Sequence, residues 1–236
     1  MSNVLIVAAH PDDETLGMGG TILTHVQKGD KVYCLILADG ISSRYYPLKR
    51  KSHQQNEIEQ REYQAVKVSD LLHIEQIEFC SFPDQRLDTL PLLVITKSIE
   101  QMKADVLPNI VYTHFEYDLN LDHRVAYQAT MTAFRPLPVN SFTTYPCSEI
   151  YSFEIPSSTE WSSVQFNPNI FVSLSLNQLT TKIEALKLYE DELRPYPHPR
   201  SIEAIIMRSR YWGSVCGHEY AEAFKLIRQI KGEVDR

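Results

Sequence analysis

The sequence predicts an α/β fold: a Rossmann-like, mostly parallel sheet flanked by helices, with extra strands in the C-terminal half. In the first half of the 236 residues, short β-branched apolar runs alternate with amphipathic segments, which is the pattern of βαβ units. The second half is interrupted by prolines and by Ser/Thr-rich stretches, and further strands fit there better than a second unit. We therefore expect a single domain over residues 1–236.

The strands expected in the first half are short apolar runs, each followed by a helical segment. The first and most apolar run is 4–9. We expect a Gly-rich turn after it and then a helix over 21–28, which stops at Gly29 because glycine suits the left-handed position that follows a helix. The remaining elements of this half are strands at 32–38, 76–80 and 109–113, and helices at 56–72, 92–103 and from about 123.

The second half is expected to add two strands and three helices. The strands are placed at 149–155 and 170–174, and the helices at 176–193, 201–211 and 220–230. The loosely patterned segment 135–170 has no clear period. We expect this segment to decide how large a substrate the protein accepts.

Charge and cysteine content exclude several classes of protein. The formal net charge of −7 argues against a nucleic-acid partner, and the basic cluster from Lys49 to Lys51 is short enough for a solvated loop. Four cysteines without a CxxC pair indicate reduced thiols in a cytoplasmic protein. We expect neither a signal peptide nor a transmembrane segment. The thirteen tyrosines would suit a homo-oligomer.

Two bursts of ionisable residues follow predicted strands. The first strand runs into residues 10–14 (HPDDE), and the fourth runs into the polar segment 114–123. In the strand order 3-2-1-4 of doubly wound sheets, the first and fourth strands are neighbours, so their loops face one crevice. We expect these two segments to form one site.

The ionisable residues of the two segments suit a catalytic metal. His10, His123 and one of the adjacent aspartates, Asp12 or Asp13, supply two nitrogens and one oxygen, which is the ligand set of a catalytic zinc with a fourth position open for water. Zinc lowers the pKa of its bound water towards about 7, and a carboxylate that is not a ligand can accept the proton as general base. Adjacency alone leaves open which aspartate has which role.

Two other interpretations concern the residues of these segments and the glycines that follow the first one. A histidine at a strand end is more often structural than functional, and an aspartate after proline is a common turn or helix-capping residue. The glycines of segment 17–20 resemble a phosphate-binding loop, but Ile22 stands at the third glycine position, and the preceding carboxylates would repel a pyrophosphate. We expect these glycines to permit a close approach of helix and strand.

Residues 9–17 (AHPDDETLG) resemble the signature of the PIG-L/LmbE-like zinc-dependent N-acetylglucosaminyl deacetylases. The resemblance implies one Zn²⁺ per chain held by His10, Asp13 and His123, with Asp12 as general base. Other segments similar to the family are 39–40 (DG), 61–62 (RE), 82–84 (FPD), 122–124 (DHR), 198–201 (HPRS) and 221–224 (AEAF).

The resemblance also implies a reaction, which is hydrolysis of the N-acetyl or another N-acyl group of a small amino sugar or amino-sugar conjugate by zinc-bound water. Asp122 would orient a neighbouring histidine. Arg61, Asp84 and Arg86 would contact sugar hydroxyls or an anionic substituent. Two alternatives stay open: an amidase that acts on a larger conjugate, and a non-catalytic, Rossmann-like protein that binds a sugar or nucleotide.

One departure from the family affects the mechanism. Many members have His-Pro-Asp-His where this chain has residues 120–123 (NLDH). Asn120 can donate a hydrogen bond to an oxyanion but cannot deliver a proton. The proton donor is therefore Asp12 in its protonated form or one of the histidines His114, His198 and His218.

Overall fold

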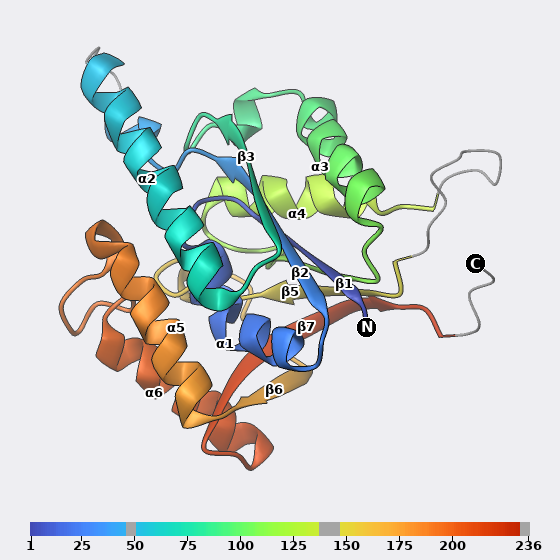
Figure 1. Cartoon of the computed structure of the whole chain (residues 1–236), viewed down its shortest axis with the longest axis vertical. Helices are drawn as coiled ribbons and strands as arrows, with labels where there is room; N and C mark the ends of the chain where they lie inside the picture. Colours follow the sequence, from blue (N-terminus) through green and yellow to red (C-terminus); the bar gives the residue numbers. More distant parts are fainter. Residues whose placement is uncertain (46–50, 137–146, 232–236) are drawn as a thin grey trace.

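The computed structural model describes residues 1–45, 51–136 and 147–231. Within these residues a seven-stranded sheet forms the centre, in the order β3-β2-β1-β4-β5-β7-β6 (Figure 1). The five strands from β3 to β5 run parallel, β7 runs antiparallel to β5, and β6 runs antiparallel to β7. The strands are β1 (Asn3–Ala8), β2 (Lys31–Ala38), β3 (Gln76–Phe82), β4 (Ile110–His114), β5 (Glu149–Phe153), β6 (Ile170–Leu174) and β7 (Tyr220–Gln229).

Helices cover both faces of this sheet, so the predicted α/β fold and the strand order 3-2-1-4 are confirmed. Helices α3 and α4 lie on one face, and α1, α2 and α5 lie on the other (Figure 1). None of the helices in the described part of the chain is long and apolar enough to cross a membrane. The helices are α1 (Asp13–Gln27), α2 (Lys51–Leu72), α3 (Leu92–Val106), α4 (Leu121–Ala133), α5 (Leu176–Leu188) and α6 (Ile202–Cys216).

Strand β1 is apolar throughout because both of its faces are buried. Val4 and Ile6 pack into the core beneath α1, α2 and α5, whereas Leu5 and Val7 pack into the core beneath α3 and α4. A central parallel strand with helices on both faces cannot show the polar alternation of a half-exposed strand. Strand β1 therefore ends inside the core, and the polar residues that follow it lie at the carboxyl end of the parallel strands.

Helix α1 begins earlier than the sequence predicts. The helix starts at Asp13, not Thr21, and it contains the Gly-rich segment that we expected to be a turn. A kink at Met18, where φ is −152°, interrupts the helix. Carboxylates in the first turn favour a helix start at this position because they interact well with the positive end of the helix dipole.

The glycines of α1 allow the helix to approach the sheet closely, as expected. A Cβ atom at Gly17 would lie 2.5 Å from the Phe153 ring, and one at Gly20 would lie 2.4 Å from the Leu174 side chain. Neither position can hold a side chain without displacing a strand residue of β5 or β6. Gly29 follows the helix with φ +81°, the left-handed conformation that the sequence predicts there.

The predicted helix at 220–230 is wrong, because this segment forms β7 between β5 and β6. Its alanines, glutamate and leucine favour a helix locally, but two neighbouring strands supply hydrogen bonds on both sides. The buried Glu222 accepts hydrogen bonds from the backbone N–H groups of Gly20 (3.0 Å) and Thr21 (2.7 Å), next to the kink in α1. Tertiary contacts therefore decide the conformation of this segment.

Some expectations fall on residues outside the described ranges. These are Lys49 and Arg50 of the basic cluster and residues 137–146 of the loosely patterned segment. Within the described part of that segment, Ser157 Oγ accepts a hydrogen bond from Arg200 Nε at 3.0 Å, and Thr159 Oγ1 donates to Asp118 Oδ2 at 2.5 Å.

Candidate active site

The two polar segments meet at the carboxyl ends of β1 and β4, which pair in parallel. His10 and Asp13 follow β1, and His123 lies in the first turn of α4, which follows β4. The Asp13 Oδ2 atom lies 3.2 Å from His10 Nδ1 and 3.3 Å from His123 Nε2. These three residues could hold a metal ion, and we call them the metal-binding group. All three are buried, and one ligand atom from each lies within 4.8 Å of the others.

The metal-binding group fits a zinc ion by its chemistry and by its unsatisfied atoms. Asp13 Oδ1 and both ring nitrogens of His123 are buried and have no hydrogen-bond partner among the described residues. Buried polar atoms without partners cost free energy unless a ligand satisfies them. Two imidazole nitrogens and one carboxylate form the donor set typical of a catalytic zinc.

Each histidine of the metal-binding group also contacts a carboxylate through its other ring nitrogen. His10 Nε2 lies 3.1 Å from both Asp122 Oδ2 and Asp84 Oδ1, and His123 Nδ1 lies 3.1 Å from Asp118 Oδ1. Carboxylates in this position fix the orientation and tautomer of metal-binding histidines. This arrangement leaves His10 Nδ1 and His123 Nε2 to face Asp13.

The carboxylates around His10 also determine its charge. Burial alone would lower the pKa of His10, but hydrogen bonds to Asp122, Asp13 and Asp84 raise that pKa well above its usual value.

His10, Asp84 and Asp122 form a second group with possible metal-ligand geometry. Both Asp122 oxygens already accept backbone N–H groups, from Gln85 at 2.7 Å and Leu87 at 3.0 Å. This hydrogen bonding makes Asp122 an orienting residue more readily than a ligand.

Asp12 has an unusual backbone conformation. Its φ of +134° lies in a region that residues with a side chain rarely adopt, and such strain concentrates at functional sites. Its backbone N–H donates to Glu14 Oε2 at 3.0 Å, so Glu14 supports this conformation at the start of α1. Adjacent carboxylates therefore point to different places, with Asp13 between the histidines and Asp12 in the wall of a cavity.

The environment of Asp12 raises its pKa to about 7. Burial is the largest cause, and it is opposed by the Arg200 guanidinium, whose Nη1 donates to Asp12 Oδ2 at 2.8 Å. A carboxylate that exchanges protons near neutral pH is suited to general acid–base catalysis.

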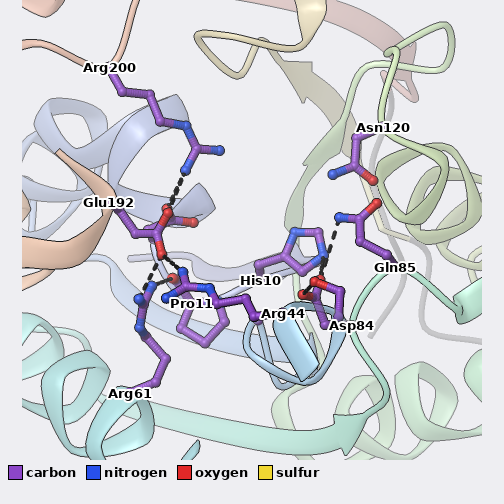
Figure 2. Close-up of a pocket in the computed structure, with 12 residues that line it drawn as sticks. His10, Pro11, Arg44, Arg61, Asp84, Gln85, Asn120, Glu192 and Arg200 are labelled. Atoms are coloured by element: carbon purple, nitrogen blue, oxygen red, sulfur yellow. Dashed lines mark hydrogen bonds and ion pairs between the residues drawn. The ribbon is translucent and has the colours of Figure 1, made fainter. Parts of the chain in front are cut away.

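A cavity of about 190 Å³ opens beside these residues (Figure 2). Figure 2 shows Arg200, Glu192 and Arg61 on one side of it and Asn120 and Gln85 on the other. The lining is almost entirely polar, which suits a hydroxylated substrate better than a lipid chain. The residues that line the cavity are His10, Pro11, Asp12, Gly40, Ser43, Arg44, Arg61, Asp84, Gln85, Asn120, Glu192 and Arg200.

One carboxylate gathers three arginines at this cavity. Glu192 forms ion pairs with Arg44, with Arg61 (2.6 Å) and with Arg200 (3.2 Å). Burial would raise the pKa of Glu192, but the three guanidinium groups lower it. We call these four residues the Glu192 network. Sequence reasoning missed Glu192, Arg44 and Arg200 as site residues, and the only signal was the family-like segment 198–201.

The structure brings two of the three predicted substrate-binding residues to the cavity. Arg61 is buried and donates to the Pro11 carbonyl (3.4 Å) and to Glu192. Asp84 accepts from Ser43 and contacts His10, so both residues are partly engaged by protein groups. Arg86 is not among the residues that line the cavity in the described part of the chain.

Asn120 has a structural role in addition to its position at the cavity. It is the N-cap of α4, and its Oδ1 accepts the backbone N–H of Asp122 at 2.9 Å. Because the oxygen is used in this way, the side-chain NH₂ group is left to face the cavity (Figure 2). Asn120 therefore presents a hydrogen-bond donor to a substrate.

The three histidines considered as proton donors do not line the cavity. His114 is fully buried, and its Nε2 accepts the Ala9 N–H at 2.8 Å; burial and the neighbouring His123 lower its pKa well below the usual value. His198 is exposed, and its Nδ1 accepts the backbone N–H of Arg200. His218 follows the end of α6. Of the described histidines, only His10 reaches the cavity.

The comparison with protein families decides the classification. The PIG-L family, described as GlcNAc-PI de-N-acetylase, matches residues 5–134. This is more than half of the chain and includes both polar segments. The chain belongs to the PIG-L family of deacetylases.

Curated relatives of this PIG-L family member agree with the assignment. The uncharacterized deacetylase YaiS of Escherichia coli strain K12 is 30% identical over 192 residues, which cover 79% of this chain and 90% of YaiS. The diacetylchitobiose deacetylase of Thermococcus kodakarensis is 25% identical over 252 residues, which cover 98% of this chain and 85% of that protein.

The fold itself occurs with a different chemistry. The crystal structure of GalB, the 4-carboxy-2-hydroxymuconate hydratase of Pseudomonas putida KT2440, has a TM-score of 0.74 and 19% identity, and each chain is covered completely. This likeness concerns the fold alone. The reaction of the PIG-L family member must therefore be argued from its site.

Proposed function

We propose that this protein hydrolyses the N-acetyl group of an amino sugar or amino-sugar conjugate, with one zinc ion and with Asp12 as general base. The proposal rests on one observation, which is that the adjacent carboxylates Asp12 and Asp13 lie in different places. Asp13 lies between His10 and His123 with an unsatisfied oxygen, whereas Asp12 lines the cavity. A hydrolase needs both a metal ligand and a base that is not a ligand.

Zinc would be held by His10 Nδ1, His123 Nε2 and the Asp13 carboxylate. When bound there, zinc supplies a Lewis acid that makes a water molecule acidic and polarises a carbonyl group. Asp84, Asp118 and Asp122 hold the two imidazole rings in the orientation that this binding requires.

Asp12 would move the proton in both halves of the reaction. Its carboxylate takes a proton from the attacking water as the water oxygen bonds to the amide carbon, and the π electrons of the carbonyl move onto its oxygen. The electron pair on this oxygen then re-forms the carbonyl as the carbon–nitrogen bond breaks, and the protonated Asp12 gives its proton to the departing amine. The products are a free amino sugar and acetic acid, which loses its proton to solvent and becomes acetate. No other described group at the cavity is as well suited. Asn120 cannot release a proton, and His10 is part of the metal-binding group. Burial would raise the pKa of the other two carboxylates, Asp84 and Glu192, but contacts with His10 and with the three arginines lower it.

The substrate class rests on the relatives and on the cavity. The family description names a GlcNAc conjugate, and one relative is a diacetylchitobiose deacetylase. Arg61, Asp84, Gln85 and Asn120 offer donors and acceptors for sugar hydroxyls. An amidase that acts on a larger conjugate would use the same catalytic residues, so substrate size separates the two functions.

We also infer that the protein acts in the cytoplasm. All four cysteines are free thiols. Cys34 and Cys147 are buried, and burial raises the pKa of each thiol, which makes both unreactive. Unpaired, unreactive cysteines are typical of proteins in a reducing compartment.

Acetate release from a panel of N-acetylated sugars tests the proposed function. The purified protein is assayed as isolated, after chelation of its metal, and after zinc is returned. We expect release that disappears on chelation and returns with zinc. Sugar binding without acetate release would instead favour a non-catalytic binding protein. Release only from large conjugates would favour the amidase.

A further inference from the structure

Arg200 lines the cavity but has no role in the reaction steps proposed above. It lies directly before Ser201, the N-cap of α6, in a turn closed by the hydrogen bond from Ser201 N–H to the His198 carbonyl (2.9 Å). The backbone of this turn is also bonded to an earlier part of the chain, since the Arg194 N–H donates to the Arg200 carbonyl at 3.4 Å. Arg200 therefore extends from a fixed backbone toward the cavity.

Three of the five N–H groups of the Arg200 guanidinium have protein acceptors. Nε donates to Ser157 Oγ at 3.0 Å, and Nη1 donates to Asp12 Oδ2 at 2.8 Å and to Glu192 Oε2 at 3.2 Å. The side chain is only 19% exposed. A planar guanidinium held at two nitrogens cannot rotate freely, so the direction of the third nitrogen is also fixed.

The remaining nitrogen of Arg200, Nη2, has no acceptor among the described residues. Figure 2 shows this terminal nitrogen directed across the cavity, toward the side that carries Asn120. The NH₂ group of Asn120 is the donor on that opposite side, since its oxygen caps α4. N–H donors from Arg200 and from Asn120 therefore lie on opposite sides of the cavity, where a bound substrate can accept from them.

We propose that Arg200 is a catalytic residue, which stabilises the negative charge that develops on the amide oxygen when water attacks the carbonyl carbon. This inference rests on the proposed function. Nη2 donates to the oxygen while Nη1 stays on Asp12, so one rigid cation links the base to the site of charge development. Fixed donors aimed at a developing oxyanion often make the largest contribution to catalysis.

The chemistry of arginine fits this role and the departure at position 120. Arginine stays positively charged at any physiological pH, so it can stabilise a negative charge but does not transfer a proton. Where many relatives have a histidine, this chain has Asn120, which donates only a neutral hydrogen bond. Arg200 supplies the positive charge that Asn120 lacks, and Asp12 remains the proton carrier.

Kinetics of Arg200→Gln, on the panel sugar that the wild-type protein hydrolyses best, test this inference. Because the lost interaction forms mainly in the transition state, we expect kcat to fall by about 10²- to 10³-fold with little change in KM. Zinc content and Tm, measured on the same sample, should match the wild type. Arg210→Gln, an exposed arginine of α6 that lies outside the cavity, is the matched control and should keep the wild-type kcat.

Chemical rescue separates a catalytic cation from a structural one. In Arg200→Ala, added guanidinium at millimolar concentration should restore part of the lost kcat, whereas urea, which has the same shape without the charge, should not. If Arg200→Gln keeps the wild-type kcat and KM, Arg200 is dispensable and the inference is overturned. If the variant raises KM alone, Arg200 only binds the substrate in its ground state, which also overturns the inference. Loss of zinc or of folded structure without rescue would also overturn it. A wild-type protein that releases no acetate would refute the proposed function itself.

Discussion

The two sides of the cavity are built in different ways. On the metal-binding side, His10 and His123 follow two neighbouring parallel strands, and each ring is held by a nearby buried carboxylate. On the other side, the Glu192 network joins long side chains from four separate segments: η1 (Ser42–Tyr45), α2, η4 (Glu190–Glu192) and the turn before α6.

This difference indicates a difference in function. Short side chains at strand ends have few rotamers and a fixed geometry, which a metal requires. Long cations from loops depend on their shared carboxylate for position, and their guanidinium groups suit contact with a polar substrate. We therefore expect substitutions on the metal-binding side to change zinc affinity, and substitutions in the Glu192 network to change kinetics without loss of zinc.

Asp12 stands between the two sides, and its substitution should have the largest effect. We predict that Asp12→Asn lowers kcat by about 10²- to 10⁴-fold, the usual range for loss of a general base. Zinc content, measured by atomic absorption, should remain at the wild-type value because Asp12 points to the cavity and not to His123. Asp70→Asn, an exposed position on α2, is the control. Retained kcat, or loss of zinc comparable to that of Asp13→Asn, would contradict this role.

Asp118 tests the metal-binding side alone. Its Oδ1 lies 3.1 Å from His123 Nδ1, and its Oδ2 accepts from Thr159 Oγ1 at 2.5 Å. We predict that Asp118→Asn weakens zinc binding by about 10- to 100-fold, because His123 loses the carboxylate that orients it. Competition with a chromophoric chelator measures this affinity directly. Asp105→Asn, exposed on α3, should bind zinc like the wild type; equal affinity in both variants would show that Asp118 does not orient the ligand.

Glu192 tests the opposite side and should have the smallest effect of the three. We predict that Glu192→Gln raises KM by roughly tenfold, because the arginines that Glu192 positions would contact the substrate less well. The size corresponds to the loss of one charge-assisted hydrogen bond between a guanidinium group and the substrate, of about 1.5 kcal/mol. Zinc affinity should not change, because Glu192 contacts arginines and not the metal-binding group. Its exposed neighbour provides the control variant, Glu190→Gln. A loss of zinc in Glu192→Gln would mean that the two sides are not independent.

Local sequence patterns were sufficient for the parallel half of the fold and for the meeting of His10, Asp13 and His123. The apolar run of β1 predicts a buried strand because both of its faces are covered. Residues 10–14 and 114–123 predict one site because strand order places β1 beside β4. The family resemblance implies separate roles for Asp12 and Asp13, and in the structure Asp12 pairs with Arg200 whereas Asp13 lies between His10 and His123.

The errors have a common physical origin in contacts that are distant in sequence. The segment 220–230 has the composition of a helix, but it becomes β7 because β5 and β6 provide partners on both edges. The sequence predicts too late a start for α1, because its Gly-rich segment has the composition of a turn. That segment is helical and fits closely against Phe153 and Leu174.

The sequence by itself determined the fold class, the family and the residues suited to a metal, because these depend on periodicity and on a dense local motif. Only the tertiary structure decided what surrounds them. Arg200 meets Asp12 across 188 residues of sequence, and Glu192 gathers arginines from three other segments. Such contacts leave no periodic or local signal, since they form only when the loops at one edge of the sheet converge.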